Sequence, residues 1–278
     1  MEKYEILGKL GNGKFGTVFS GVYKKSRMKS NEKVAIKMEE LRTPQKLLKH
    51  ETTILKYLYD HGCRTIPTVY WFGIHEQSTC LVMSFYEISL FDFLKKGELT
   101  IEQINKIMVA AIEILDSVHK LFVLHRDIKP QNFMIKNSEL YLIDFGLSTI
   151  FLRENGEHVP ECSQDSIIGT PKYISFFVHD GILPSRRDDL ISLGYIYIYL
   201  FCRELPWDVL QTNSFDNEIF TELSIEHPKN KQRKEFKSWT YLESICLKIN
   251  TKIHSYLSYC YGLKYKDIPN YEGMCNAF

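Results

Sequence analysis

The pattern of apolar and polar residues changes character after about residue 85 of the 278-residue chain. Before that point, short apolar runs rich in β-branched and aromatic residues alternate with glycine-rich or polar turns, a pattern typical of strands. One segment there instead repeats leucine and isoleucine at helical spacing behind a Thr-Pro pair. We therefore predict a helix over 45–59 and strands over 4–10, 17–23, 33–38, 68–74 and 79–85.

Helical spacing dominates the rest of the chain. Residues 100–121 would place eight apolar side chains on one side of a helix, and Thr100 could cap its start. Loop and short strand are expected over 124–143, and mostly helix from Asp188 onward. The polar, poorly periodic segment 211–239 is expected to be a long surface loop with a short helix.

A strand-rich first part and a helix-rich remainder predict an α+β fold of two lobes. The chain shows no internal repeat and no low-complexity segment that would favour another architecture. The boundary between the lobes is expected near residues 84–88. Because ligands favour clefts between lobes, the functional site is expected there.

Composition and charge exclude several classes of protein. The hydrophobic fraction of 44% and the charged fraction of 25% are those of an ordinary globular domain. A net charge of +1 gives the whole protein no attraction to nucleic acid or anionic lipid, so a basic site must be local. The seven cysteines form no C-x-x-C pair, which predicts reduced thiols rather than a metal site or a disulfide framework.

No segment indicates secretion or a membrane. The amino-terminal residues lack an apolar signal core, and the most apolar stretch, 193–202, is too short to cross a bilayer. No lipidation signature is found at Phe278. We therefore expect a cytosolic or nuclear protein that binds neither membrane nor nucleic acid.

The most informative motif is H-R-D-I-K-P-Q-N at 125–132, followed by D-F-G at 144–146. These segments supply the groups that phosphoryl transfer from a metal-bound nucleotide requires. Asp127 is the candidate base for a substrate hydroxyl, and Lys129 can stabilise charge on the transferred group. Asn132 and Asp144 offer oxygen atoms to Mg²⁺. The alternative is a polar loop joining two core elements.

A glycine-rich segment, G-N-G-K-F-G-T-V at 11–18, precedes V-A-I-K at 34–37. The glycines alone are a weak signal, because a tight hairpin also needs them. Since the β-branched residues that follow continue a strand, a hairpin covering a nucleotide is favoured over a dinucleotide fold. Lys37 can then neutralise phosphate oxygens if a carboxylate holds it. We favour Glu51 on the following helix over Glu39 and Glu40, which are expected to face water at the strand end.

Two further residues of the 125–132 motif have less direct roles. His125 is more often a packed structural histidine in such a setting, because Asp127 already fills the role of the base. Arg126 could be an ordinary surface cation, but a contact with the segment after D-F-G is favoured.

Together these motifs resemble the eukaryotic protein kinase family, in order, from Gly11 to at least Gly194. The resemblance implies one kinase domain over 1–278, with ATP bound between a β-rich lobe (about 1–84) and a larger helical lobe (about 89–278). Lys129 resembles the lysine of serine/threonine kinases. Thr170 resembles the threonine that contacts the catalytic aspartate and lysine, and Asp189 the aspartate that anchors the catalytic loop.

Four other stretches resemble casein kinase 1: residues 66–73, 185–195, 205–207 and 256–271. The resemblance implies a monomeric, constitutively active enzyme that uses ATP and Mg²⁺. It would phosphorylate serine or threonine in proteins with acidic or already phosphorylated residues before the target. The chain departs from the family at Ser175-Phe176-Phe177, where Phe177 replaces an asparagine.

The resemblance also implies a nucleotide pocket and an anion site. The adenine base would lie against 83–86, near backbone groups of Phe85 and Tyr86, although Met83 could be plain core. Ile6 is a plausible further wall. The predicted ATP-binding residues are Leu10, Gly11, Gly13, Gly16, Val18, Ala35, Lys37, Met83, Phe85, Tyr86 and Ile143.

The predicted anion site consists of Arg186 with Lys231, Arg233 and Lys234, because guanidinium groups suit phosphate. The alternative for 231–234 is a solvated run of charge. One of Arg186 and Arg187 is expected to pair with the acidic pair 188–189 instead.

Two other functions remain as alternatives. A pseudokinase scaffold would lack at least one catalytic residue, and none is missing here. A small-molecule kinase of related fold is disfavoured by the complete glycine-rich segment, by V-A-I-K and by the G-T-P-K-Y segment at 169–173.

Overall fold

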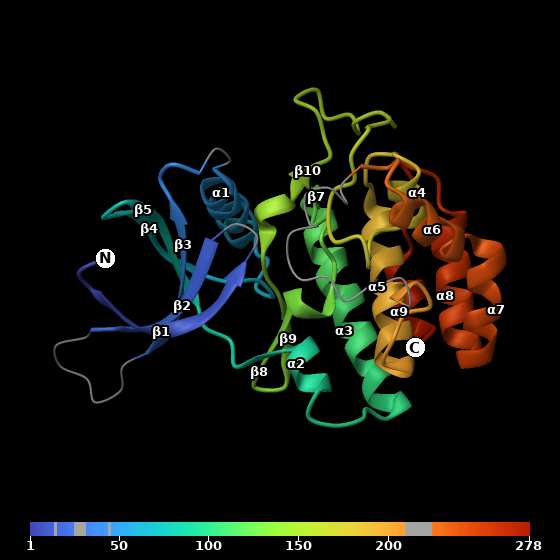
Figure 1. Ribbon diagram of the computed structural model, residues 1–278, viewed down its shortest axis with the longest axis horizontal. Helices are drawn as coiled ribbons and strands as arrows, with labels where there is room; N and C mark the ends of the chain where they lie inside the picture. Colours follow the sequence, from blue (N-terminus) through green and yellow to red (C-terminus); the bar gives the residue numbers. More distant parts are fainter. Residues whose placement is uncertain (14–15, 25–31, 44–45, 209–223) are drawn as a thin grey trace. The chain divides into compact units, whose positions relative to one another are not determined.

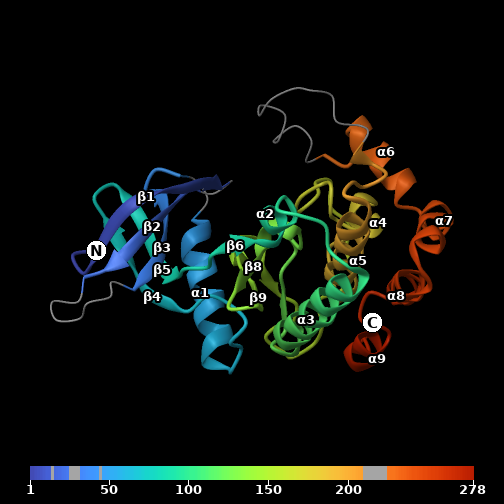
Figure 2. The ribbon, with the colours of Figure 1, turned by 90° about the horizontal axis from the view of Figure 1, so that it is seen from below.

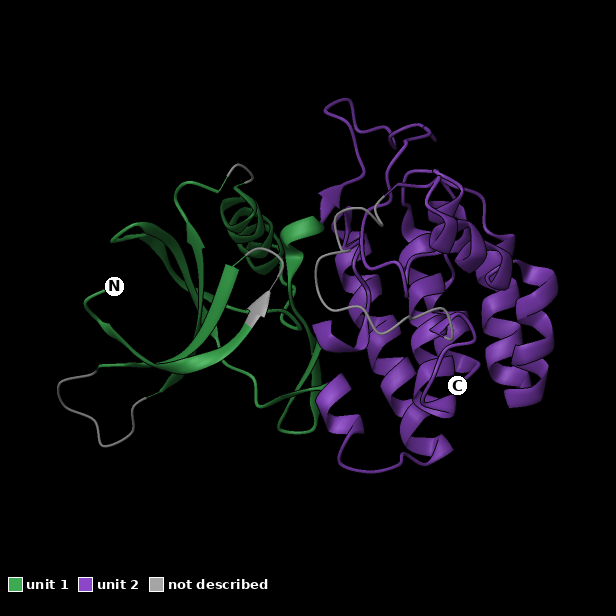
Figure 3. Ribbon diagram, viewed as in Figure 1, with its two compact units in different colours: residues 1–89, 133–147 green, residues 90–132, 148–278 purple. Residues whose placement is uncertain are grey.

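The computed structural model of the protein describes residues 1–13, 16–24, 32–43, 46–208 and 224–278 (Figure 1). Parts of the predictions for 45–59 and 211–239 therefore lie outside the described residues. The chain forms two compact units (Figure 3). Unit 1 comprises Met1–Ser89 and Phe133–Leu147, and unit 2 comprises Leu90–Asn132 and Ser148–Phe278.

Unit 1 is built on a five-stranded antiparallel sheet of order β1-β2-β3-β5-β4. Because side chains alternate along a strand, each strand contributes to both faces of the sheet. Val34, Ile36 and Val82 form an apolar cluster on one face, and Ala35 and Lys37 alternate with them onto the other. The strands are β1 (Tyr4–Gly13), β2 (Gly16–Tyr23), β3 (Lys33–Glu40), β4 (Val69–His75) and β5 (Ser78–Ser84).

A helix and a small second sheet complete unit 1. Helix α1 (Leu47–Asp60) buries Leu48, Ile54, Leu55 and Leu58 along one stripe, which is the spacing that predicted it. It packs against the short 3₁₀ helix η2 (Phe145–Leu147). The second sheet, of order β6-β8-β9, consists of β6 (Ile88–Ser89), β8 (Phe133–Lys136) and β9 (Glu139–Leu142).

Unit 2 is mainly helical. Its helix α5 is buried along almost its whole length and packs against α3 and α8 (Figures 1 and 2). Most of the apolar stretch 193–202 therefore lies inside a globular unit, whereas Phe201 and Cys202 at its end are exposed. The helices are α2 (Leu90–Leu94), α3 (Ile101–Lys120), α4 (Phe176–His179), α5 (Arg186–Cys202), α6 (Pro228–Phe236), α7 (Trp239–Ile249), α8 (Thr251–Gly262) and α9 (Tyr271–Asn276).

Three shorter elements of unit 2 frame the 125–132 motif. Strand β7 (Val123–Leu124) pairs with β10 (Thr149–Ile150), and the 3₁₀ helix η1 (Pro130–Asn132) closes the motif. In the described ranges of the chain, no helix is long and apolar enough to span a membrane.

The predicted α+β class and the predicted strands of the first 85 residues are confirmed. Thr100 caps α3 as predicted, and a reciprocal bond joins it to Gln103. A short helix, α6, is present within 211–239. All seven cysteines are free thiols. Among the described residues, no group of three or more His, Cys, Asp or Glu side chains could hold a metal ion.

Candidate active site

In unit 1, Lys37 lies between two carboxylates. Its Nζ donates to Glu51 Oε2 at 2.7 Å and to Asp144 Oδ1 at 2.7 Å. Lys37 is only 5% exposed, and Glu51 only 1%. Burial disfavours the charged amine, but the two carboxylates outweigh it and raise the pKa of Lys37 above its ordinary value. Lys37 therefore remains a cation in a site with little water.

The structure places Glu51 at Lys37, in preference to the two glutamates that follow Lys37 on the same strand. Glu40 is exposed, as expected. The expectation that Glu39 faces water is wrong, because Glu39 is only 2% exposed. Residues two apart on a strand share a face, so Glu39 lies on the face of β3 that carries Lys37. No described group hydrogen-bonds to either of its carboxylate oxygens.

Asp144 follows β9 at a sharp change of chain direction. Its φ of 68° lies in the left-handed region, which is uncommon for a residue other than glycine. The next residues, Phe145 and Gly146, are buried in η2 against α1. This packing anchors the turn that presents the Asp144 carboxylate to Lys37.

The predicted walls of the nucleotide pocket lie partly on the face of the sheet that carries Lys37. Val18 pairs with Lys37 across β2 and β3, and Ala35 pairs with Met83 across β3 and β5. Paired residues share a face of the sheet, and so do residues two apart on a strand. Val18, Ala35, Lys37 and Met83 therefore form one continuous patch.

Gly16 needs to be glycine. Its φ is 143°, and a Cβ atom built there would lie 2.1 Å from the carbonyl oxygen of Met38. Gly16 pairs with Gly13, and Gly11 pairs with Val18, so the predicted glycines form the β1–β2 hairpin. The two residues at its tip, 14–15, lie outside the described part of the chain.

The remaining predicted nucleotide residues differ in exposure. Leu10 is 53% exposed, whereas Met83 and Tyr86 are buried. Burial raises the pKa of Tyr86, whose ring lies 4.7 Å from that of Tyr141. Phe85 is partly buried, and the Lys33 amine lies 5.6 Å from the centre of its ring. Ile143, which directly precedes Asp144, is also partly buried. Ile6, the further wall, is 38% exposed.

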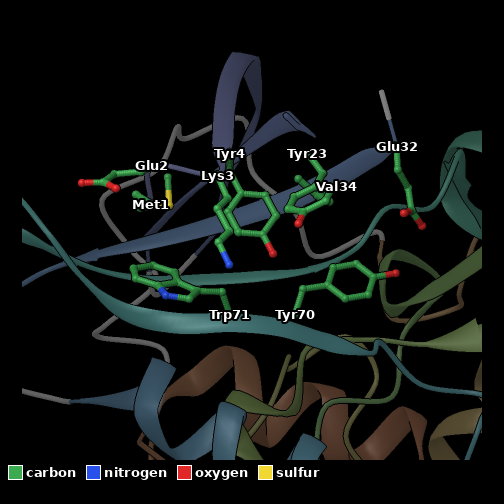
Figure 4. Close-up of a pocket in the computed structure, with 9 residues that line it drawn as sticks. All are labelled: Met1, Glu2, Lys3, Tyr4, Tyr23, Glu32, Val34, Tyr70 and Trp71. Atoms are coloured by element: carbon green, nitrogen blue, oxygen red, sulfur yellow. The ribbon is translucent and has the colours of Figure 1, made fainter. Parts of the chain in front are cut away.

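A pocket of about 570 Å³ opens on the opposite face of the five-stranded sheet (Figure 4). Val34 contributes to it, and Val34 alternates with Ala35 and so faces away from the Lys37 patch. This pocket contains none of the predicted ATP-binding residues. It is lined by Met1, Glu2, Lys3, Tyr4, Tyr23, Glu32, Val34, Tyr70 and Trp71.

In unit 2, the Asp127 carboxylate is held by three side chains. Lys129 Nζ donates to Oδ2 at 2.7 Å, and Thr170 Oγ1 donates to Oδ1 at 2.7 Å. Lys129 Nζ also lies 3.0 Å from Thr170 Oγ1, which closes a triangle. Asn132 Nδ2 donates to the carbonyl oxygen of Asp127 at 2.8 Å and lies 3.2 Å from Oδ2. The motif therefore forms one rigid polar cluster, with Asp127 only 6% exposed.

The oxygen donors fit a hard divalent cation. Because the Asn132 amide nitrogen is used within the cluster, its neutral amide oxygen is the atom suited to a metal. Asp144, in unit 1, offers a carboxylate of which 28% of the side-chain surface is accessible. Carboxylate and neutral oxygens are the kinds of donor that Mg²⁺ uses beside phosphates.

Asp189, on α5, anchors the chain just before Asp127. Its Oδ2 accepts from the backbone N–H of His125 at 2.8 Å and from His119 Nε2 at 3.0 Å. Its Oδ1 accepts from the backbone N–H of Arg126 at 2.9 Å. Burial alone would raise the pKa of Asp189, but His119 and His125 outweigh burial and lower it.

His125 and Arg126 behave as the sequence indicated. His125 is fully buried, and its Nδ1 lies 3.3 Å from the backbone N–H of Asp127. Arg126, with a φ of 66°, donates from its guanidinium to the carbonyl oxygen of Ser148 at 3.3 Å. Ser148 lies two residues after the D-F-G motif, so the predicted contact is present.

The four cations of the predicted anion site each have protein partners. Arg186 is 9% exposed and donates to the Lys266 carbonyl oxygen at 2.7 Å. Arg233 is buried beside Asn230, and Lys234 pairs with Asp180. The fourth, Lys231, pairs with Glu226. A shared anion site of Arg186 and the three α6 cations stays a prediction.

The segment that departs from casein kinase 1 has a packing explanation. Ser175 caps α4, with its Oγ accepting from Val178 N at 3.1 Å, and donates to Asp188. The Arg187 guanidinium lies 3.7 Å from the ring centre of Phe177. Arg187 also lies 3.8 Å from Asp188, which is the pairing expected for one of the two arginines. Phe177 thus covers a buried arginine.

Two residues at the segment after Thr170 were not predicted. Lys237 donates to the carbonyl oxygens of Pro171 and Ile174, and Trp207 Nε1 donates to that of Lys172 at 2.7 Å. In the sequence, Trp207 belongs to the L-P-W stretch at 205–207 and carries no sign of this contact. Lys237 ends a basic stretch that resembles a solvated surface, so no local signal separates it from its exposed neighbours.

Comparison with known families agrees with this geometry. The family model described as "Protein kinase domain" matches residues 4–260, which is most of the chain and contains every residue of both clusters. The family's two-lobed α+β fold accords with one strand-rich and one helical unit.

Proposed function

The chain belongs to the protein kinase domain family, and from this membership we propose that it is a serine/threonine kinase of casein kinase 1 type. Members of this family use ATP and a divalent metal and transfer a phosphoryl group to proteins. The proposal concerns the acceptor hydroxyl, the kind of substrate and the regulation.

The triangle of Asp127, Lys129 and Thr170 carries the proposal. As the substrate oxygen bonds to the γ-phosphorus, the bond to the β-phosphate oxygen breaks, and Asp127 takes the hydroxyl proton. Lys129 offsets charge on the transferred group. Thr170 fixes Asp127 Oδ1, and this threonine together with Lys129 is the pairing that resembles serine/threonine kinases.

In this proposal, the nucleotide binds at the cluster formed by Lys37, Glu51 and Asp144. Lys37, held by Glu51, supplies a fixed positive charge for phosphate oxygens. We propose that it acts on the same nucleotide as the Asp127 cluster. Asn132 and Asp144 would hold Mg²⁺, which neutralises charge on the phosphates when bound.

A kinase of casein kinase 1 type is expected to prefer substrates that carry acidic or phosphorylated residues before the target serine or threonine. Among the predicted anion-site residues, Lys231 and Lys234 are the more accessible, with 58% and 34% of their side-chain surfaces exposed. Lys231 pairs with Glu226 and Lys234 with Asp180, and a substrate phosphate can replace these carboxylates. Arg186 and Arg233 are buried and would support such a site from beneath.

The central test is Asp127→Asn with Mg-ATP and three peptides that differ only in a Ser, Thr or Tyr acceptor. We expect the wild type to phosphorylate the Ser and Thr peptides, and the variant to lose at least about 10²-fold in kcat. ATP affinity should persist, because Asp127 belongs to the hydroxyl side of the reaction. Near-normal turnover in the variant, or preference for the Tyr peptide, contradicts the proposal.

A peptide series with neutral, acidic and phosphorylated residues before the target tests the substrate class. We expect the neutral peptide to be the poorest substrate. In the Lys231→Ala/Lys234→Ala double variant, the difference in phosphorylation rate between the neutral peptide and the other two should be smaller. Constitutive activity is tested by phosphatase treatment of the purified protein, which should leave kcat unchanged. Equal rates on all peptides, or a kinase silenced by phosphatase, would refute the casein kinase 1 type.

A further inference from the structure

Lys237, the residue that follows α6, is a buried amine with an unusual set of partners. It is 0% exposed. Its Nζ donates to the carbonyl oxygens of Pro171 at 2.9 Å and Ile174 at 2.7 Å, and lies 3.0 Å from His179 Nε2. Its Nζ also lies 5.0 Å from the ring centre of Trp207. In the described part of the chain, Lys237 forms no ion pair with a carboxylate, and burial together with the charge of Arg233 holds its pKa well below the ordinary value, although Asp208 acts in the opposite direction.

The Lys237 amine has a partner in each direction. A buried amine is unfavourable unless its hydrogen bonds are satisfied, and here the Nζ atom faces two carbonyl oxygens and the ring nitrogen of His179. Burial, followed by the charges of Lys237 and Arg233, holds the pKa of His179 well below its ordinary value. The two carbonyl groups are therefore fixed by an N–H donor that an apolar side chain cannot replace.

The fixed carbonyls belong to the segment that begins with Thr170. At its start, Gly169 has a φ of 106°, and a Cβ atom there would lie 2.5 Å from the Arg126 carbonyl oxygen. The Thr170 hydroxyl then donates to Asp127. Farther along, Trp207 holds the Lys172 carbonyl between the two that Lys237 holds. The segment 169–174 is thus fixed at one end by the catalytic loop and at the other by Lys237.

We propose that Lys237 is a positioning residue of the phosphoryl-transfer site: it fixes the backbone of 171–174 and, through that backbone, the Thr170 hydroxyl on Asp127. The inference rests on the proposed function, because Thr170 and Asp127 act in that reaction. Lys237 touches neither substrate nor nucleotide in this account. Its effect reaches the reaction only through Thr170.

A double-mutant cycle in the full chain tests this route. The four proteins are wild type, Lys237→Met, Thr170→Ala and the double variant, assayed with saturating Mg-ATP and a Ser peptide. We expect Lys237→Met to lower kcat about 10²-fold, because a small displacement at a reacting group has effects of that size. The KM for ATP should stay within about twofold. The kcat of the double variant should equal that of Thr170→Ala, because the effects of two residues that act through one another are not additive.

The outcomes that overturn the inference are distinct. If the kcat of Lys237→Met stays within about twofold of wild type, Lys237 does not position Thr170. A double variant whose loss equals the product of the two single losses shows that Lys237 acts independently of Thr170. A wild-type chain that transfers no phosphate to any peptide instead overturns the proposed function, and the inference falls with it.

Two further variants separate positioning from folding. Tyr256→Phe removes another buried hydrogen bond of unit 2, from Tyr256 to the Leu190 carbonyl at 2.9 Å, and should leave kcat unchanged. If Lys237→Met does not fold, Trp207→Phe tests the same segment, because it removes the indole donor to Lys172 and part of the ring beside Lys237. We expect its kcat to fall several-fold in a protein with wild-type circular dichroism. An unchanged kcat in that variant overturns the inference.

Discussion

At the residue scale, the catalytic loop at 125–132 is held by a carboxylate of helix α5 that takes no part in the chemistry. Asp189 accepts hydrogen bonds from two successive backbone N–H groups and from a histidine ring. One of those backbone positions, Arg126, has a φ of 66°. Asp189 therefore holds a strained backbone conformation that puts Asp127 in place.

The pH dependence of stability follows from Asp189. Its pKa is lower in the folded protein than in the unfolded chain, so its contribution is present above about pH 4 and is lost as the pH falls through the lower folded value. We expect Asp189→Asn to reduce the free energy of unfolding by about 1–3 kcal/mol at pH 7, because one donor loses its acceptor. The difference from wild type should shrink below about pH 4.

Urea denaturation of both proteins between pH 7 and pH 3 measures this difference. Asp92→Asn is the matched control, because Asp92 is exposed and pairs with Lys95 at the surface, so the change should alter stability by less than about 1 kcal/mol. A constant difference between wild type and Asp189→Asn across the pH range would contradict the assignment.

Residues in chemical motifs could be identified from the sequence, and residues that act by packing could not. The Lys37–Glu51 contact was predictable because a lysine on a strand and a glutamate on the next helix have few other partners. The prediction that Glu39 faces water was wrong, because the alternation of side chains along the strand decides burial there more than nearness to the strand end does. Lys237 was missed, because its burial depends on α6 closing against the segment at 171–174.

At the element scale, α3 shows how a local signal fixes a boundary. Thr100 Oγ1 accepts from Gln103 N at 3.2 Å, and Gln103 Oε1 accepts from Thr100 N at 2.8 Å. We expect Thr100→Ala to destabilise the protein by about 1 kcal/mol, the usual value of a lost N-cap. Thermal unfolding measures it, with Thr53→Ala as a control at an exposed threonine inside α1. Equal effects of the two changes would argue against the cap.

Long periodic elements were predictable and short ones were not. Helix α3 and the strands of the first sheet match their predicted spans within a few residues. The four residues of α4 and the three of η1 are too few to show a period, and capping contacts such as Ser175 to Val178 define them. Helix α5 is buried nearly all round, so its apolar residues alone could not reveal which face meets α3.

At the scale of the whole molecule, ligand binding should be visible as stabilisation. Mg-ATP at 100 times its dissociation constant should add about 2.7 kcal/mol to the free energy of unfolding, if it binds only the folded chain. Because Asp144 supplies the carboxylate of the proposed metal site, Asp144→Asn should reduce this gain.

Thermal shift assays with and without Mg-ATP measure the effect, and Asp127→Asn is the control that should retain it. Equal shifts for wild type and Asp144→Asn would contradict the metal assignment. The loss of the shift in Asp127→Asn would contradict the separation of hydroxyl and nucleotide roles between the two clusters.

The indole of Trp207 has a practical consequence. It is buried, its Nε1 donates to the carbonyl oxygen of Lys172, and its ring lies beside the Lys237 amine. The chain contains only two other tryptophans, Trp71 and Trp239. Replacing those two with phenylalanine would leave a single intrinsic fluorophore at this segment, so its emission would report optically, without any attached label, on peptide engagement.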